Sequence, residues 1–149
     1  LYHDDIVLMV KMEKMAAASA IPRVKPSPDL AFFDTETQKT IASAIKSLMK
    51  EQTLFRNPGL KLEHLAKRLH LPRQQLSAFI NQYYRMNFTQ LINSFRIDYA
   101  KEILNNPDEI RPLEQLFPDF GFYSRSTFNR VFKAATGLSP AEFRQQKSA

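Results

Sequence analysis

The apolar residues of this 149-residue chain recur three and four positions apart, which is the spacing of one face of an α-helix. The alternation of apolar and polar residues that is typical of a half-buried strand does not appear in the sequence. We therefore expect an all-α fold with about seven helices. They are predicted at about 36–52, 62–69, 73–84, 88–105, 112–120, 125–135 and 140–146.

Residues with strong preferences for helix ends mark several of these boundaries. Thr35 and Gln38 have the spacing of a capping box at the start of the first helix. Near the C-terminus, Gly137 predicts a helix stop, Ser139 a new cap and Pro140 the first position of the final helix. The short stretches between these signals predict tight connections between neighbouring helices.

Pro118 conflicts with the helix in which it falls. It stands inside the stretch 113–120, where a proline removes a backbone hydrogen bond and strains the preceding turn, at a cost of about 3 kcal/mol in a helix interior. We expect this helix to be shortened or kinked.

The apolar skeleton of residues 65–91 returns about 51 positions later with different residues between its members. The corresponding pairs are Leu65 with Leu116, Leu71 with Phe122, Leu76 with Phe128, Ile80 with Phe132, and Leu91 with Phe143. Two short helices with a tight turn between them form a helix-turn-helix. We therefore predict two homeodomain-like helix-turn-helix subdomains, at about 60–87 and 112–146, joined by a long linker helix at about 88–105.

The polar residues between the repeated apolar positions differ between the two subdomains. In the second, Arg125, Ser126, Asn129 and Arg130 fall on one solvent face, and Ser124 stands at the helix start, where a phosphate is favourably held. Arginine can bond guanine O6 and N7 together, and asparagine can do the same to adenine. These side chains predict a DNA-reading surface.

The equivalent face of the first subdomain carries Arg73, Gln74, Ser77 and Ala78. It has less charge and would read bases through Gln74 and through methyl contacts. The repeat keeps the residues that build the scaffold and varies those that would read sequence. We therefore expect the two faces to recognise different base pairs.

Charge is unevenly distributed along the chain. The net charge is +6, yet residues 1–35 carry −1 and residues 36–149 carry +7. A basic folded region favours a polyanion as partner, most simply nucleic acid. Residues 1–35 have no route to a core of their own, so we interpret them as a remnant or linker segment ahead of a domain at 36–149.

Several function classes have no support in the sequence. The chain contains no cysteine, which excludes disulfides, thiolate metal sites and cysteine nucleophiles. It has no glycine-rich phosphate loop and no HExxH motif, and His64 and His70 are too far apart to be a metal pair on one helical face. We expect no enzyme activity, no catalytic residues, no cofactor and no metal.

Three stretches resemble the arabinose-regulator (AraC/XylS) family of bacterial transcription factors. They are "LEHLAKRLHLPRQQLSAFI", "NFTQLINSFRIDYAKEIL" and "GFYSRSTFNRVFKAATGLSPAEFR", and together they cover about residues 60–146. The resemblance implies a cytoplasmic transcription regulator, or the cytoplasmic part of a larger protein, that binds double-stranded DNA sequence-specifically. It also implies RNA polymerase as a possible second partner, which an activator would contact, and a sensor or dimerisation domain upstream. Activation and repression both stay open.

The resemblance further implies that recognition helices at about 73–84 and 125–135 enter successive major grooves on one face of DNA. The family's base-contacting positions correspond to Arg73, Gln74, Ser77 and Ala78 in the first unit. In the second unit they correspond to Arg125, Ser126, Asn129 and Arg130. The alternative is a helical protein-interaction module without DNA binding.

Two groups of residues inside the helices have competing interpretations. Tyr83, Tyr84, Phe88 and Phe95 could form a stacking platform for single strands, but their helical spacing favours core packing. Arg96 has a charged neighbour two positions on, at Asp98, and we favour a structural ion pair over a DNA contact for this arginine.

Overall fold

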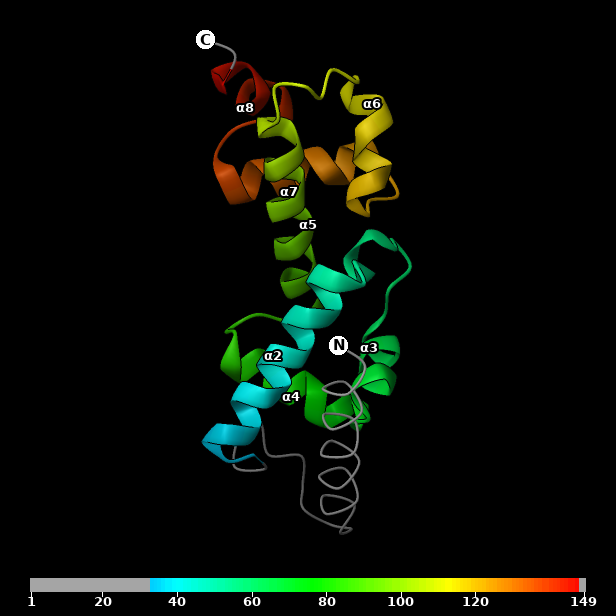
Figure 1. The fold of residues 1–149 in the computed structure, drawn as a ribbon, viewed down its shortest axis with the longest axis vertical. Coiled ribbons are helices and arrows are strands. Elements are labelled where there is room, and N and C mark those ends of the chain that lie inside the picture. The colour runs from blue at the N-terminus through cyan, green and yellow to red at the C-terminus, as the bar shows by residue number, and fades with distance from the viewer. Residues whose placement is uncertain (1–32, 148–149) are drawn as a thin grey trace. The chain divides into compact units, whose positions relative to one another are not determined.

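The computed structural model describes residues 33–147 of the chain, so the predicted segment 1–35 lies almost wholly outside the described residues. Seven α-helices and two 3-10 helices occupy the described part, and no strand occurs there (Figure 1). The predicted all-α class is confirmed. The elements are α2 (Thr35–Glu51), η2 (Leu54–Arg56), α3 (Leu62–Leu69), α4 (Arg73–Tyr83), α5 (Phe88–Asn105), α6 (Leu113–Leu116), η3 (Phe117–Phe120), α7 (Arg125–Thr136) and α8 (Pro140–Lys147).

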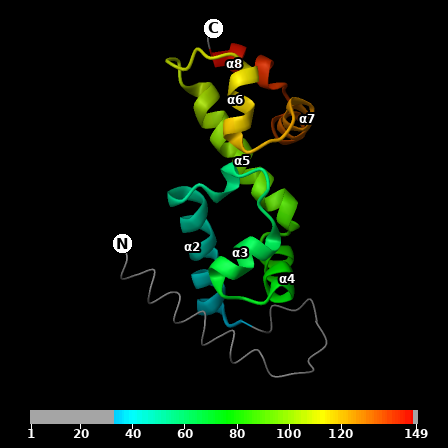
Figure 2. The same ribbon diagram turned by 90° about the vertical axis from the view of Figure 1, so that its right-hand side faces the viewer.

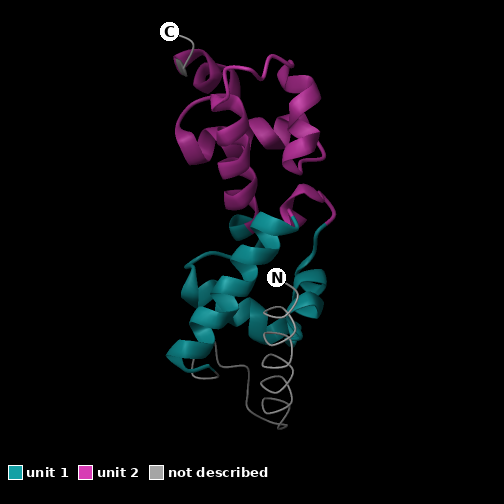
Figure 3. Cartoon of the chain, in the orientation of Figure 1, with its two compact units in different colours: residues 1–52, 60–91 teal, residues 53–59, 92–149 magenta. Residues whose placement is uncertain are grey.

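The described chain forms two compact units, each with its own helix-turn-helix (Figure 3). The first unit consists of the residues up to Gln52 together with Leu60–Leu91, and the second consists of Thr53–Gly59 together with the residues from Ile92 onward. The chain thus leaves the first unit after α2, contributes one short segment to the second, and returns for α3. Helix α5 begins in the first unit and continues into the second.

Helix α2 is part of the first unit's core together with α3 and α4 (Figure 2). Its apolar stripe buries Ile41, Ile45 and Met49 completely. Just before the helix, the ring of Phe33 meets that of Phe79 on α4 edge-on, with 6.3 Å between centroids. This first helix-turn-helix therefore depends on residues that precede it by some twenty positions in the chain.

The start of α2 differs from the predicted capping box. Asp34, rather than Thr35, is the N-cap, and its carboxylate accepts a hydrogen bond from the Thr37 amide at 2.7 Å. The Gln38 side chain donates instead to the carbonyl of Phe33 at 2.9 Å. Aspartate is a better N-cap than threonine, and starting one residue earlier leaves Thr35 as the first helical residue.

The repeated apolar skeleton forms the cores of both units. Nine of the ten paired residues are buried, and Phe143 is partly buried. The first unit uses aliphatic side chains where the second uses phenylalanine. In the second unit the ring of Phe128 lies 5.3 Å from those of Phe120 and Phe122 and 5.6 Å from that of Phe132, measured between centroids.

Pro118 shortens the scaffold helix of the second unit, as expected. The stretch predicted as one helix divides into α6, which ends at Leu116, and the 3-10 helix η3. Pro118 is exposed in the first turn of η3, where its missing N–H is not required, and its carbonyl accepts from the Gly121 amide at 3.1 Å. The proline is therefore not inside an α-helix.

Equivalent residues of the two units adopt the same left-handed backbone. His70 has φ of 55° and Arg85 has φ of 57°, and their counterparts are Gly121 with 98° and Gly137 with 78°. A residue other than glycine pays about 1–2 kcal/mol in this conformation. The first unit accepts that cost at two positions where the second uses glycine.

Arg96 attaches the segment Thr53–Gly59 to the second unit. Its Nε donates to the carbonyl of Phe55 at 2.8 Å and its Nη2 to the carbonyl of Asn57 at 3.0 Å. Its guanidinium lies over the ring of Phe122, 5.6 Å from the centroid, and burial lowers its pKa. The predicted structural role is seen, but its partners are carbonyl oxygens and not the carboxylate of Asp98, which faces another side of the helix.

Gly121 lies where this segment crosses the turn of the second helix-turn-helix. A Cβ at this position would come within 2.3 Å of the Phe55 carbonyl oxygen and 2.8 Å of Arg96 Nε. A Cβ on Gly137, in contrast, would meet nothing within 4 Å. Glycine is thus required at 121 by close approach as well as by backbone conformation.

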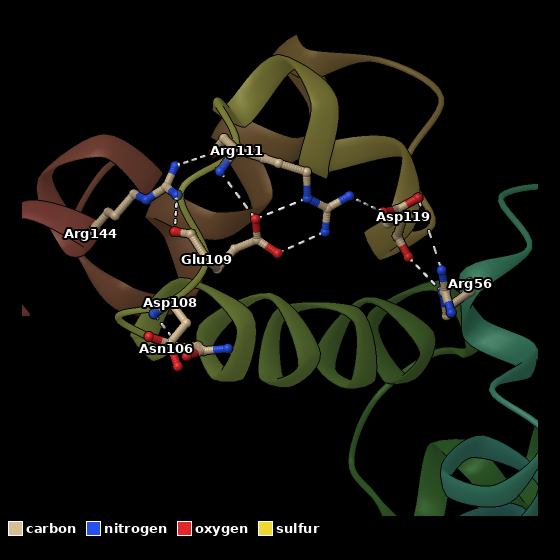
Figure 4. Close-up of polar contacts among 7 residues, drawn as sticks. All are labelled: Arg56, Asn106, Asp108, Glu109, Arg111, Asp119 and Arg144. Atoms are coloured by element: carbon tan, nitrogen blue, oxygen red, sulfur yellow. Dashed lines mark hydrogen bonds and ion pairs between the residues drawn. The ribbon is translucent and has the colours of Figure 1, made fainter.

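A polar network links the 106–112 loop of the second unit to η3 and α8 (Figure 4). Arg111 donates to both carboxylate oxygens of Glu109, at 2.9 and 2.7 Å, and pairs with Asp119 at 3.4 Å. Arg144 donates to the backbone carbonyls of Arg111 and Glu109, and Asp119 also accepts from Arg56 through its own carbonyl at 2.9 Å. The side chain and amide of Arg111 lower the pKa of Glu109 to about 2.

Replacing Gly121 with alanine should destabilise the protein more than the same change at Gly137. Both variants place an alanine at positive φ, which should cost about 1–2 kcal/mol. Only Gly121→Ala also forces a Cβ against backbone atoms, and overpacking of this kind adds about 1–3 kcal/mol. Free energies of unfolding in urea measure the difference. Equal losses for the two variants would contradict the close approach.

The contribution of Glu109 to stability should depend on pH. Because its pKa is about 2 in the folded protein and 4.5 ordinarily, its stabilising effect is present above pH 4.5 and is lost as the pH falls toward 2. Glu109→Gln should therefore lower the free energy of unfolding at neutral pH and match the parent near pH 2. Urea titrations across this range provide the measurement, and a constant difference would contradict the assignment.

Candidate nucleic-acid interface

Helix α7 exposes one polar face while its opposite face builds the core. Ser124 caps the helix, and its Oγ accepts from the Thr127 amide at 3.1 Å. Phe128 and Phe132 are fully buried beneath it. The four residues predicted to read DNA lie on the remaining surface. Arg125, Ser126 and Arg130 are exposed, and Asn129 is half-buried.

Helix α4 exposes the equivalent face in the first unit. It follows Pro72, which supplies no side-chain cap, and it buries Leu76, Phe79 and Ile80. The four predicted residues again lie on the other side. Arg73 and Gln74 are exposed, whereas Ser77 and Ala78 are half-buried. Each unit thus brings its own four residues to one surface.

The two faces differ in charge. Helix α7 carries Arg125, Arg130 and Lys133 and no acidic residue, whereas α4 carries Arg73 as its only charged residue. Since phosphate contacts supply most of the affinity of proteins for DNA, α7 is the better suited of the two for anchoring. The weakly charged α4 has the amide of Gln74 as its main polar group for base recognition.

Each recognition-helix face includes an ion pair that sequence reasoning missed. Arg73 Nε lies 2.8 Å from a carboxylate oxygen of Glu63 on α3, and Arg125 Nη1 contacts a carboxylate oxygen of Glu114 on α6. All four side chains are about half exposed. The two glutamates are 51 positions apart, the same offset as the scaffold residues, and this offset was the available signal.

Tyr123 is a second residue that the sequence reasoning did not single out. It stands in the turn immediately before α7, and its side chain is 79% exposed. An aromatic ring so exposed, next to the capped start of a basic helix, is a candidate for contact with the DNA backbone through its hydroxyl.

The aromatic residues at the end of α4 pack against one another, although Tyr83 is 40% exposed and so meets the predicted core packing only in part. The ring of Tyr83 stacks on that of Phe79 with 4.9 Å between centroids, and Tyr84 meets Phe79 edge-on at 6.1 Å. Burial raises the pKa of Tyr84 to about 12. Phe88 and Phe95 are half-buried. These contacts support core packing over a platform for single strands.

Neither a metal site nor a membrane-spanning helix occurs among the described residues. Among residues 33–147 there is no group of three His, Asp or Glu side chains placed to hold a metal ion. Within the same range, none of the helices has the length and apolar character that crossing a membrane requires.

Comparisons with known proteins agree with the fold. A family model described as a helix-turn-helix domain matches residues 65–146, more than half of the chain. The uncharacterized HTH-type transcriptional regulator YtdP of Bacillus subtilis is 28% identical over 88 residues, which are 59% of this chain and 11% of YtdP. The chain therefore spans about a tenth of the length of that relative.

Solved structures extend the likeness. The C-terminal domain of AraT, a response regulator from Geobacillus stearothermophilus, is 26% identical with a TM-score of 0.61, over 71% of this chain and 84% of that one. A transcriptional regulator from Chromobacterium violaceum with an AraC-type DNA-binding domain has a TM-score of 0.58. It is 20% identical over 72% of this chain and 96% of its own, so this likeness concerns the fold alone.

Proposed function

Because the chain belongs to the helix-turn-helix family of AraC-type DNA-binding domains, whose members are transcription regulators, we propose that both of its units read one DNA site. Helices α4 and α7 each enter a major groove, and the two grooves are successive on one face of the duplex. The site is asymmetric, since the two helices present different side chains.

One observation carries this proposal: equivalent positions lie on the polar side of both recognition helices, and three of the four carry different residues in the two units. Arg73 and Arg125 are both the first residue of a recognition helix. The paired core residues of the two helices, Leu76 with Phe128 and Ile80 with Phe132, are all buried. Gln74 and Ser126, which come directly after the two arginines, are exposed and differ in side chain. A duplicated fold that served packing alone would have no need for a constant frame around a variable exposed face.

The proposed contacts follow from side-chain chemistry. Arg125 and Arg130 donate to guanine, Asn129 donates to and accepts from adenine, and Ser126 donates to phosphate or a base edge. Ser124 Oγ already donates to Thr127 Oγ1, so a phosphate would be held there by the start of the helix. In the first unit Arg73 and Gln74 supply the polar contacts, while Ser77 and Ala78 approach methyl groups.

Partners other than DNA are proposed from the family resemblance. We propose RNA polymerase as a second partner, and contact with it from a DNA site would make the protein an activator. We also propose that the protein works in the cytoplasm. The chain spans 11% of its relative YtdP, so we further propose a sensor or dimerisation domain elsewhere in the same polypeptide.

The salt dependence of duplex binding should separate DNA recognition from a helical protein-interaction module. Each phosphate that a lysine or arginine neutralises should add about −0.9 to the slope of log K against log salt, so duplex binding through several phosphates should give a steep negative slope. Fluorescence anisotropy with a labelled duplex at several salt concentrations gives this slope. A slope near zero would favour the protein-interaction alternative.

Substitutions in the two recognition helices should affect different halves of the site. Arg125→Ala or Arg130→Ala should weaken binding by about 1–3 kcal/mol and relax base preference in one half, and Gln74→Ala should relax the other. Lys39→Ala, on α2, is the matched control and should leave both halves unchanged. Selection of bound duplexes from a random pool, followed by sequencing, measures the preferences.

A palindromic selected site bound only by a dimer would contradict this arrangement. So would substitutions in α4 and α7 that blur the same base pairs. Footprints of the parent protein should cover two adjacent major grooves.

A further inference from the structure

The two ion pairs at the recognition helices occupy equivalent places in their units. Glu63 is the second residue of α3 and Glu114 the second residue of α6, while each paired arginine is the first residue of the following recognition helix. The same contact therefore occurs twice, between elements that share little sequence. Its recurrence calls for a reason common to both units.

Helix stability does not explain the arginines. The first position of a helix lies at the positive end of its dipole, where a cation is unfavourable and an anion is favourable. Arg73 and Arg125 therefore stand where their charge weakens the helix. Glu63 and Glu114 lie at the favourable N-terminal ends of their own helices. The backbone N–H of Glu63 and the guanidinium of Arg73 lower the pKa of the Glu63 carboxyl. It is ionised at neutral pH.

The contacts leave most of each guanidinium available. A guanidinium has five N–H donors, and each glutamate is contacted through one nitrogen. Arg73 uses Nε, which leaves the pair of terminal nitrogens, and Arg125 uses Nη1, which leaves the edge formed by Nε and Nη2. Either remaining edge can donate two hydrogen bonds to the O6 and N7 of one guanine.

The strength of these pairs limits what they can do. Because all four side chains are about half exposed, each pair should change an equilibrium by about 1.5- to 5-fold. That is too little to keep an arginine from DNA. It is enough to favour one arrangement of a long side chain before the base arrives, which lowers the entropy lost on binding.

We propose that Glu63 and Glu114 are positioning residues that hold Arg73 and Arg125 for base recognition, and that they thereby set the sequence selectivity of each recognition helix more than its affinity. This inference rests on the proposed DNA binding. The carboxylates also repel phosphates, so they disfavour arrangements in which the arginines bind the DNA backbone of any sequence.

Removing Glu114 should therefore raise the affinity for a scrambled duplex without raising the affinity for the selected duplex. We would compare the parent protein with Glu114→Ala on a duplex selected by the parent and on a scrambled duplex at one salt concentration. Affinity for the scrambled duplex should rise about 2- to 5-fold as the carboxylate is lost. Affinity for the selected duplex should stay the same or fall, so the ratio of the two should drop at least two-fold.

Three further variants separate positioning from other roles. Glu102→Ala removes an equal charge from an exposed position on α5, in the same unit, and should leave the ratio unchanged. Glu114→Gln keeps the acceptor oxygen without the charge and should retain an intermediate ratio. In an Arg125→Ala background, Glu114→Ala should no longer alter the ratio, since the side chain to be positioned is gone.

Glu63→Ala should produce the same drop for base pairs in the other half of the site. An unchanged ratio in both glutamate variants, or equal gains on both duplexes, would overturn the inference while leaving DNA recognition intact. A parent protein that does not distinguish the duplexes would instead overturn the proposed function itself. Thermal unfolding of each variant shows that the comparison is made on folded protein.

Discussion

The second unit depends on one buried guanidinium that bonds to backbone carbonyls. Arg96 is 9% exposed, and it holds the carbonyls of Phe55 and Asn57 while its plane covers Phe122. A buried charge without such partners would cost several kcal/mol, so the carbonyls and the arginine require one another. Because the segment is held this close, the turn below it has no room for a side chain, and position 121 must be glycine.

The same constraint explains a difference between the repeats. At the equivalent turn of the first unit the backbone has the same left-handed conformation, yet His70 occupies it. The left-handed conformation alone costs about 1–2 kcal/mol and is tolerated there. Gly121 is different because a backbone segment crosses it, whereas at Gly137 the left-handed conformation alone favours glycine and its counterpart in the first unit is Arg85. Two glycines of one unit are thus present for different reasons.

Sequence periodicity was sufficient for the helices and for the repeated core, because both follow from local spacing of apolar residues. It was not sufficient for the contacts of Arg96, which reach back 41 residues to Phe55, nor for the assignment of Thr53–Gly59 to the second unit. Asp34 and Thr35 are adjacent and both suit an N-cap, and the helix uses Asp34. No periodic pattern carries that information.

The candidate site was predictable to a similar extent. Its exposed residues could be identified because they are polar and lie between buried positions of a recognisable helix. The glutamates that contact Arg73 and Arg125 could not, since an ion pair between two helices depends on how those helices cross. The only signal for these glutamates in the sequence is that Glu63 and Glu114 are separated by the same offset as the repeated core residues. That signal can be interpreted only when the crossing of the helices is known.

The discontinuity of the second unit has a consequence for the nascent chain. Phe55 leaves the ribosome 41 residues before Arg96, and at about 5–20 residues per second the two are separated by roughly 2–8 s of synthesis. All residues of the first unit are available within that interval. Its helices can therefore pack while the short segment between α2 and α3 is still without its partner, and the second unit closes around that segment only after the helices that follow Arg96 have been synthesised.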